Sequence, residues 1–233
     1  MQLRAPRAVL FDIGDTVLAE KRFDLEAGIA SVVGSRADVD ALARAFRALV
    51  AESHRRQTEP LLAGWLRAAV PDLADQSVES IEDAIWPAIV TLEPRAGIVT
   101  VLSALARDGI VVGAVSNAAF SGRVLELELK RHDLADDFRF VLTSADVGSR
   151  KPAAPIFDAA VAQLRVAPAD VWFVGDTYDE DIVGARAAGL TPIWFTDERL
   201  ELSSVEFTVV RSWREFGDLY GSQWTSHLDS HPE

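Results

Sequence analysis

The sequence predicts an α/β fold, with a parallel sheet covered by helices on both faces and an inserted all-helical segment. Six short apolar segments rich in β-forming residues predict the strands: Ala8–Phe11, Ile110–Val115, Phe138–Leu142, Val171–Val174, Pro192–Phe195 and Phe207–Val210. Helical patterns lie between most of them, as where Ile98, Val99, Leu102 and Leu105 share one face. Apolar strands that alternate with amphipathic helices are typical of parallel sheets buried on both sides.

The stretch from residue 19 to residue 93 interrupts this alternation, because it contains helical patterns and no convincing strand. Asp38 or Asp40 can cap a first helix, a second pattern covers about Leu61–Val70, and a third starts near Ser77. We interpret an all-helical insertion after the first strand of an α/β domain as a cap over the core.

These patterns divide the chain into three parts. We expect a core of residues 1–18 and 94–220, a cap of residues 19–93, and a polar, frayed tail of residues 221–233. A chain of 233 residues is long enough to bury a core of this size.

Composition excludes several classes of function. The chain has no cysteine, which excludes disulfides, cysteine-ligated metals and thiol catalysis and agrees with a cytoplasmic location. Its formal charge of −13 disfavours nucleic acid and anionic membranes as partners. No apolar run reaches the roughly 18 residues that a membrane-spanning helix needs. The sequence leaves the oligomeric state open.

Polar residues follow several of the predicted strands. The carboxyl ends of parallel strands meet at one rim of the sheet, where ligands bind. Three strand ends, and two loops that can reach the same rim, supply the candidate site residues: Asp12, Ser116, Asn117, Lys151, Asp176 and Asp181. Each of these residues alone is as ordinary in a turn, a helix cap or a surface as in a site, so their combination carries the interpretation.

The chemistry of this set is coherent. Carboxylates gathered in one crevice repel each other unless a cation lies among them, and oxygen ligands without histidine or cysteine favour Mg²⁺ over zinc. Asp12 can then act as the nucleophile towards a phosphoryl group, which gives an aspartyl-phosphate intermediate. The Lys151 ammonium would offset carboxylate charge and hold the phosphate, and Ser116 and the Asn117 amide would donate to its oxygens.

In chain order, these segments resemble the four motifs of the haloacid dehalogenase superfamily. The matching segments are Asp12 with Thr16 four residues on, Ser116-Asn117, Lys151-Pro152, and Gly175-Asp176 with Asp181. The resemblance spans Val9 to about Gly189. It implies a Rossmann-like core, a helical cap that closes over the substrate, and hydrolysis of a small phosphorylated metabolite.

The resemblance also implies roles for individual residues. Mg²⁺ would be held by Asp12, the Gly14 carbonyl and Asp176, while Asp181 would support the metal or orient Lys151. Thr16 is a candidate for substrate binding. Lys21 and Arg22 follow the first motif and are candidates for lining the substrate entrance, or else plain surface residues.

One position departs from the pattern of the family's phosphatases. They usually carry a second aspartate two residues after the nucleophile, where it protonates the leaving group and later activates water. Here that position is Gly14, and an acid follows one residue later, at Asp15. Asp15 can substitute, or a cap residue such as Glu20 or Glu26 can supply the proton.

The departure leaves two other functions open. Members that cleave carbon–halogen bonds also lack the second aspartate, but they work without a metal and do not need an aspartate in the Gly-Asp motif. Both Asp176 and Asp181 are present here, which favours a phosphatase over a dehalogenase. The third alternative is a weakly active or non-catalytic relative that binds a ligand or partner at the same rim.

Overall fold

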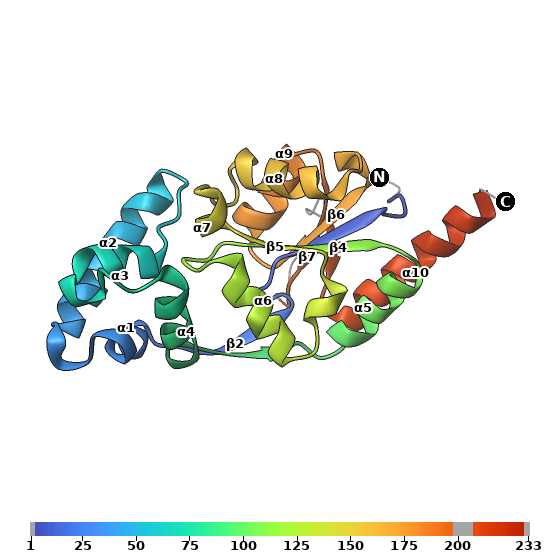
Figure 1. Ribbon diagram of the computed structural model, residues 1–233. Coiled ribbons are helices and arrows are strands. Elements are labelled where there is room, and N and C mark those ends of the chain that lie inside the picture. The colour runs from blue at the N-terminus through green and yellow to red at the C-terminus, as the bar shows by residue number, and fades with distance from the viewer. Residues whose placement is uncertain (1–2, 198–206, 231–233) are drawn as a thin grey trace.

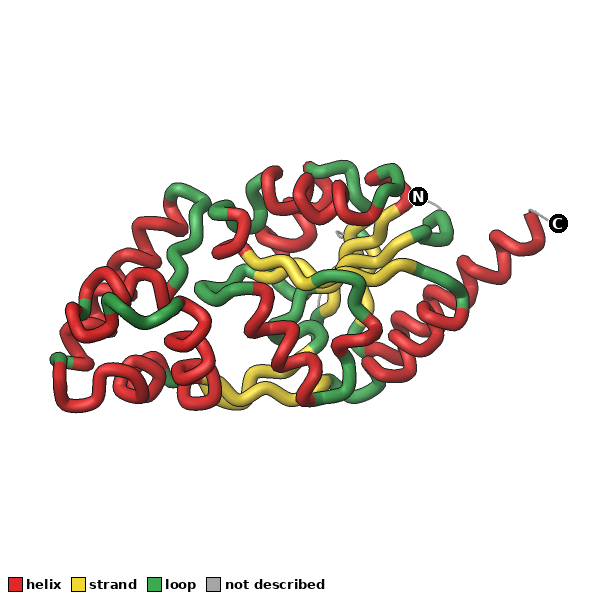
Figure 2. Tube along the Cα trace, viewed as in Figure 1, coloured by secondary structure: helices red, strands yellow, loops and turns green. Residues whose placement is uncertain are grey.

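The structure, a computed structural model, describes residues 3–197 and 207–230, with side chains as far as Ser222. Its centre is a six-stranded sheet in the order β5-β4-β1-β6-β7-β8, in which every neighbouring pair is parallel (Figures 1 and 2). The strands are β1 (Ala8–Phe11), β4 (Val111–Ser116), β5 (Val141–Thr143), β6 (Val171–Gly175), β7 (Thr191–Phe195) and β8 (Thr208–Val210). The predicted α/β architecture is confirmed.

The register of the central strands brings their polar ends together. Phe11 lies beside Ala114 of β4 on one side and beside Val174 of β6 on the other. The Asp12 amide continues the ladder by donating to the Val174 carbonyl at 2.9 Å. The residues that follow β1, β4 and β6 therefore share one rim, as the sequence predicts.

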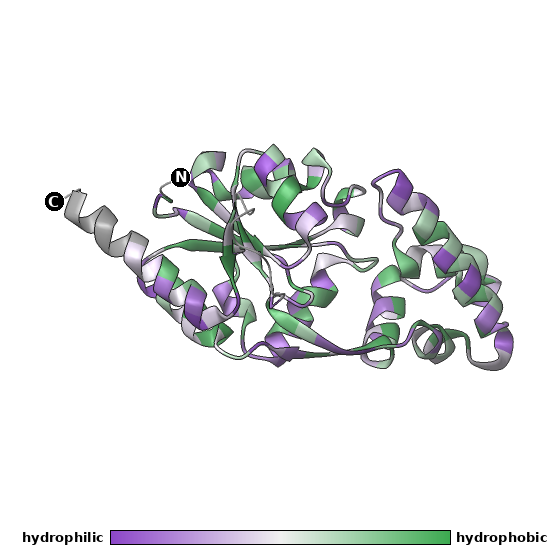
Figure 3. Cartoon of the chain, turned by 180° about the vertical axis from the view of Figure 1, so that it is seen from behind, coloured by the Kyte–Doolittle hydropathy of each residue, from purple (hydrophilic) through white to green (hydrophobic). Residues whose placement is uncertain are grey.

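Helices cover both faces of the sheet because successive strand residues point to opposite sides. Val9 and Phe11 of β1 pack in a cluster with α5 (Ile98–Arg107), α6 (Gly122–Arg131) and α10 (Trp213–Ser230). Ala8 and Leu10 pack in a second cluster with α8 (Ala154–Leu164) and α9 (Gly184–Ala187). Seen from behind, the strands between these layers are mostly apolar (Figure 3).

Four helices stand off one end of the sheet, at the left of Figure 1. They are α1 (Leu25–Val33), α2 (Val39–Arg55), α3 (Leu62–Ala69) and α4 (Val78–Ile89), and residues 25–89 are called the cap segment below. Asp38 caps α2 by accepting from the Ala41 amide, and Ser77 caps α4 by accepting from the Ser80 amide. Of the two predicted caps for α2, the structure has Asp38.

The expectation of helices alone between residues 19 and 93 was wrong at both ends of the stretch. Leu18–Phe23 (β2) and Val90–Pro94 (β3) pair antiparallel, with an irregularity between Glu20 and Arg22. These strands are mostly exposed, so their sequences lack the apolar pattern of the central strands. The ribbon joins the cap segment to the core.

Short elements complete the fold. They are α7 (Ser144–Val147), the 3-10 turns Gly34–Arg36, Pro71–Leu73, Ala135–Asp137 and Pro168–Asp170, and the π-helical segment Tyr178–Val183 (η5). Helix α10 continues through Ser230, where the sequence predicted a frayed tail; residues 231–233 lie outside the described part. Within the described ranges, none of the helices combines the length and apolarity needed to span a membrane.

A buried acid ties the cap segment to the core. Glu82 of α4 is 1% exposed, and its carboxylate accepts from the Ser121 amide at 2.7 Å and from the Ser121 hydroxyl at 2.6 Å. Ser121 precedes α6, so the charge also lies at a helix N-terminus, where anions are favoured.

Glu82→Ala is therefore expected to lower the free energy of unfolding by about 1–3 kcal/mol, because it leaves the partly buried amide and hydroxyl of Ser121 without their acceptor. Urea unfolding followed by tryptophan fluorescence measures the change. Glu126→Ala, at an exposed position of α6, is the control and should leave the midpoint nearly unchanged. Equal midpoints for the two variants would contradict the anchoring role of Glu82.

Candidate active site

Asp12 lies at the carboxyl end of the central strand and is 7% exposed. Its Oδ1 accepts from Lys151 Nζ at 2.7 Å. Ile13 is the next residue, and its carbonyl accepts from the amides of Val17 and Leu18, which closes a tight turn. The turn ends the strand abruptly and holds Asp12 at the rim.

Lys151 is buried, with 1% of its surface exposed, and its ammonium is fully engaged. Nζ donates to Asp12 Oδ1, to Asp181 Oδ1 at 2.6 Å and to the Val115 carbonyl at 3.0 Å. An ammonium has three donors, and here each has an acceptor. Burial alone lowers the pKa of Lys151, but Asp12 and Asp181 outweigh it and raise the pKa above its usual value. Lys151 is a permanent cation beside Asp12.

Asp181 is held so that it orients Lys151. Its Oδ2 accepts from the Thr177 amide at 2.9 Å, while its Oδ1 takes the lysine. The carboxylate lies against the backbone of Gly175, where a Cβ would stand 2.4 Å from Asp181 Oδ2. Any larger residue at position 175 would displace Asp181. Of the two roles predicted for Asp181, the contacts favour the orientation of Lys151.

Three carboxylates share the site. Oxygen atoms of Asp12, Asp176 and Asp181 all lie within 4.8 Å of one another. Burial raises the pKa of Asp12 to about 7; Lys151 opposes this shift, and Asp181 and Asp176 add to it. Burial and the charge of Asp181 raise the pKa of Asp176 to about 6. The acids therefore carry more negative charge than one lysine offsets.

This donor set fits Mg²⁺. Asp12 and Asp176 offer hard carboxylate oxygens on neighbouring strand ends, and a cation between them would relieve the repulsion that raises their pKa values. Thr16, buried and predicted to bind substrate, donates from Oγ1 to Asp176 Oδ1 at 3.2 Å. Its observed contact therefore orients a candidate metal ligand.

Ser116 is the last residue of β4 and Asn117 follows it, but the two have different surroundings. Ser116 is 6% exposed and borders the cavity described below. Asn117 Nδ2 donates to the Lys151 carbonyl at 3.0 Å and to Glu180 Oε2 at 2.8 Å, and its Oδ1 accepts from the Lys151 amide at 2.8 Å. The Asn117 side-chain amide, which was predicted to donate to phosphate, instead hydrogen-bonds the Lys151 backbone and Glu180 in this structure.

Gly14 and Asp15, in the turn after Asp12, have different surroundings. A Cβ built on Gly14 meets no atom within 4 Å, so the position is open. Asp15 has a φ of 51°, and its side chain accepts from the Glu20 amide at 3.1 Å and lies 3.9 Å from Arg95. Asp15 thus braces the start of β2 and is not among the three clustered acids.

The other predicted residues lie on or near the ribbon. Lys21 Nζ is 3.6 Å from Glu93, and Arg22 donates to the Ala88 carbonyl at 2.8 Å. Glu26 pairs with Arg47 at 2.7 Å. Neither Lys21 nor Arg22 is among the described residues that line the cavity, whereas Glu20 is. Burial, followed by the charge of Asp15, raises the pKa of Glu20.

Arg150 is a site residue that the sequence analysis missed. It is 8% exposed, and its Nη2 donates to Glu180 Oε1 at 2.7 Å. Its Nη1 lies 3.6 Å from Glu59 Oε2, and its amide donates to the Gln57 carbonyl at 3.0 Å. Arg150, the residue directly before Lys151, therefore joins the cap segment to Glu180. No spacing identifies such a residue, because a lone arginine before lysine is ordinary surface composition.

The family model for haloacid dehalogenase-like hydrolases matches residues 6–189, which include every clustered acid and Lys151. The chain belongs to this family. The resemblance that the sequence analysis found is confirmed, and the protein is a hydrolase of the haloacid dehalogenase-like family.

Relatives of this hydrolase include named phosphatases. Glyceraldehyde 3-phosphate phosphatase of Methanopyrus kandleri is 29% identical over 199 residues, which cover 80% of this chain and 82% of the relative. Pyrimidine 5'-nucleotidase YjjG of Escherichia coli is 35% identical over 109 residues, 46% of this chain and 47% of the relative. The second match thus spans about half of either protein.

Solved structures of both chemical types share the fold. A 2-haloacid dehalogenase from Pseudomonas syringae aligns with a TM-score of 0.69 at 20% identity, over 96% of this chain and all of the other. A HAD phosphatase from Thermococcus onnurineus aligns with a TM-score of 0.60 at 23% identity, over 92% and 97%. At such identities the likeness concerns the fold alone.

This hydrolase has a cavity of about 510 Å³ between the cap segment and the core. Gly14, Ser116 and Asn117 border it on the side of the core, and residues of β2, α2 and α4 border it on the side of the cap segment. Its volume is in the usual range for small-molecule sites. A ligand in the cavity would therefore reach the rim that holds Asp12.

Proposed function

We propose that this hydrolase is a Mg²⁺-dependent phosphatase that cleaves a small phosphate monoester through an aspartyl-phosphate intermediate. One observation carries the proposal: Asp12, next in the chain to the cavity-lining residue Ile13, contacts a buried lysine, and its carboxylate oxygen lies within 4.8 Å of oxygens of Asp176 and Asp181. Such a cluster can accept a dianionic phosphate only if cations offset its charge.

The side chains have separate tasks. Asp12 attacks phosphorus, so that a bond forms between phosphorus and the carboxylate oxygen as the bond to the leaving oxygen breaks. The Lys151 ammonium offsets the negative charge of Asp12 and of the transferring group, and the Ser116 hydroxyl donates to a phosphate oxygen. Water then cleaves the acyl phosphate and regenerates Asp12. Asp12 and Asp176 would hold Mg²⁺, which would supply positive charge that offsets the negative charge of the transferring phosphoryl group.

The relatives support the phosphate chemistry. The protein of Methanopyrus kandleri is named a phosphatase and that of Escherichia coli a 5'-nucleotidase. A ribulose-1,5-bisphosphate 5-phosphatase of Halopiger xanaduensis is 32% identical over 119 residues. Both Asp176 and Asp181 are present, and a metal-free dehalogenase does not need this density of acids. Dehalogenation is the second candidate function, because position 14 is Gly and not an acid.

Release of p-nitrophenol from p-nitrophenyl phosphate tests the proposal, with Mg²⁺ and with EDTA. The nitrophenolate leaving group needs little protonation, so the assay does not depend on an acid at position 14. We expect EDTA to lower the rate at least about tenfold. Chloride release from 2-chloropropionate that survives EDTA would establish the dehalogenase instead. Binding of Mg²⁺ without turnover of either substrate would leave a non-catalytic relative.

Gly14→Asp is expected to raise turnover of alkyl phosphates such as glycerol 3-phosphate by about tenfold or more, because a general acid is typically worth 10²–10⁴-fold. The open space around the Gly14 Cβ position can hold the new side chain. Steady-state phosphate release measures the effect. The rate on p-nitrophenyl phosphate should change little, and Gly14→Asn is the matched control. An equal gain in both variants would show that acid catalysis is not the cause.

A further inference from the structure

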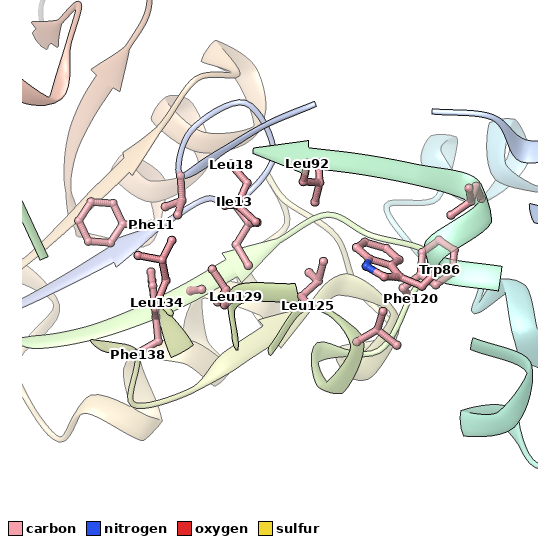
Figure 4. Packing of buried hydrophobic residues seen from close by; sticks show 14 of the residues in the cluster. Phe11, Ile13, Leu18, Trp86, Leu92, Phe120, Leu125, Leu129, Leu134 and Phe138 are labelled. Carbon is pink, nitrogen blue, oxygen red and sulfur yellow. The ribbon is translucent and has the colours of Figure 1, made fainter. Parts of the chain in front are cut away.

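The walls of the cavity consist largely of aromatic and aliphatic side chains. Phe23, Phe46, Trp86 and Phe120 each contribute a ring to its lining. The aliphatic lining includes Leu25, Val50, Ile89 and Leu92. Trp86, Leu92, Phe120 and Leu125 lie close together between the cap segment and the core (Figure 4). The cavity is therefore apolar on both of its sides.

The rings are held in place. Trp86 and Phe120 pack edge to face, with centroids 5.0 Å apart and an interplanar angle of 75°. Trp86 Nε1 donates to Glu128 Oε2 at 2.8 Å, so its one polar atom is satisfied by α6. A ring with its polar atom occupied elsewhere presents an apolar surface to the cavity.

Most charged side chains that line the cavity have ion-pair or hydrogen-bond partners, several of them outside the cavity lining. Arg47 pairs with Glu26 at 2.7 Å, and Arg150 pairs with Glu180 at 2.7 Å. Glu59 accepts from Ser144 Oγ at 3.2 Å and lies 3.5 Å from His54 Nε2. A polyhydroxylated leaving group would leave many hydroxyls facing carbon atoms, which disfavours binding.

Phe23 is an exposed ring at this cavity. It is 55% exposed at the end of β2, and it also contributes to the lining. A ligand ring in the cavity would bury part of Phe23.

We propose that the leaving group of the substrate is aromatic: the cavity takes the ring system of an aryl phosphate monoester, and the phosphate lies at Asp12. This inference rests on the proposed phosphatase function. A phenolic leaving group also suits a site with no acid at position 14, because a phenolate needs less protonation on departure than an alkoxide does. In the reaction, water replaces the phenol on phosphorus, and the products are the phenol and inorganic phosphate.

Two comparisons separate binding in the cavity from intrinsic reactivity. The first sets 2-naphthyl phosphate against phenyl phosphate, whose leaving groups have similar acidity but differ by one ring. We expect kcat/KM to rise about tenfold with the added ring, from the extra apolar surface buried. The second uses acetyl phosphate, a small activated substrate that does not fill the cavity.

Variants of the lining locate the effect. Phe23→Ser and Val50→Glu should raise KM for 2-naphthyl phosphate about fivefold or more and leave kcat/KM for acetyl phosphate within about twofold. Phe23 is exposed and Val50 half-buried, so neither change removes a core residue. Val99→Ser, at an exposed position of α5 away from the cavity, is the matched control and should change neither value.

The outcomes are distinguishable. Hydrolysis of neither acetyl phosphate nor any aryl phosphate would overturn the proposed function itself. Hydrolysis of acetyl phosphate with no gain from phenyl to naphthyl would overturn the aromatic leaving group and leave the phosphatase intact. A naphthyl preference that Phe23→Ser and Val50→Glu do not reduce would also overturn it, because the ring would then bind elsewhere.

Discussion

Asp12→Asn is expected to lower kcat for p-nitrophenyl phosphate by roughly 10³-fold or more, in the presence of Mg²⁺, because loss of a nucleophile removes the covalent route altogether. The amide has nearly the shape of the carboxylate but cannot attack phosphorus. Its oxygen can still accept from Lys151 Nζ, which keeps its contacts with Asp181 and the Val115 carbonyl. Stopped assays of phosphate release with Mg²⁺ in excess measure the loss.

The stability of this variant is a second readout with a definite sign. Because burial raises the pKa of Asp12 to about 7 from 3.8, the folded protein binds the proton more tightly than the unfolded chain between these values. The free energy of unfolding of the metal-free protein therefore falls as pH rises from about 4 to about 7, because Asp12 must ionise in the folded state. At about pH 8 the buried Asp12 carboxylate is ionised and disfavours the folded state. Asp12→Asn should then melt no lower than the wild type in EDTA. Loss of activity together with a lower melting temperature would indicate misfolding.

Asp15→Asn is the matched control for Asp12→Asn. Asp15 is half-exposed, and it accepts from the Glu20 amide in place of pointing into the acid cluster. An asparagine keeps that acceptor, so we expect activity within about threefold of the wild type. A loss comparable to that of Asp12→Asn would show that Asp15 takes the role of the missing acid at position 14.

The positions of Asp12 and Asp176 were predictable, because the sequence pattern shows where the apolar strands end. Asp12 and Asp176 each follow an apolar strand, and parallel pairing brings such ends to one rim whatever their separation in the chain. Lys151 needed the family motif, since a lysine before proline has no pattern of its own. The structure then adds why this lysine is buried: three acceptors converge on its ammonium.

Other parts depend on contacts that no local pattern records. The strands β2 and β3 are exposed and irregular, so the alternation that marks the central strands is missing. Thr16 and Asn117 looked like ligands for substrate, yet each hydrogen-bonds another site residue. Arg150 owes its burial to Glu59 and Glu180, which are far from it in sequence. Tertiary partners, and not residue type, decide these roles.

Lys151→Met is expected to lower kcat for p-nitrophenyl phosphate by roughly 10²–10³-fold, as removal of a preorganised charge from a transition state does. Methionine fills a similar volume in a position that is 1% exposed, so the packing against its neighbours is largely kept. What disappears is the cation between Asp12 and Asp181. KM should change less than kcat if the ammonium acts mainly on the transferring phosphoryl group.

The same variant should unfold more easily without metal, in a way that depends on pH and Mg²⁺. Breaking a buried charge pair from one side costs about 3–5 kcal/mol, because Asp12 and Asp181 then face each other without a cation. Protonation of Asp12, whose pKa burial raises to about 7, relieves the repulsion, so the deficit in melting temperature relative to the wild type should shrink as pH falls from about 8 to about 5. Mg²⁺ should restore part of the deficit at about pH 8 through binding to the folded state. Lys130→Met, at an exposed position of α6, controls for loss of a charge. A deficit in Lys151→Met that neither acid nor Mg²⁺ reduces would mean that lost packing, and not charge, explains the effect.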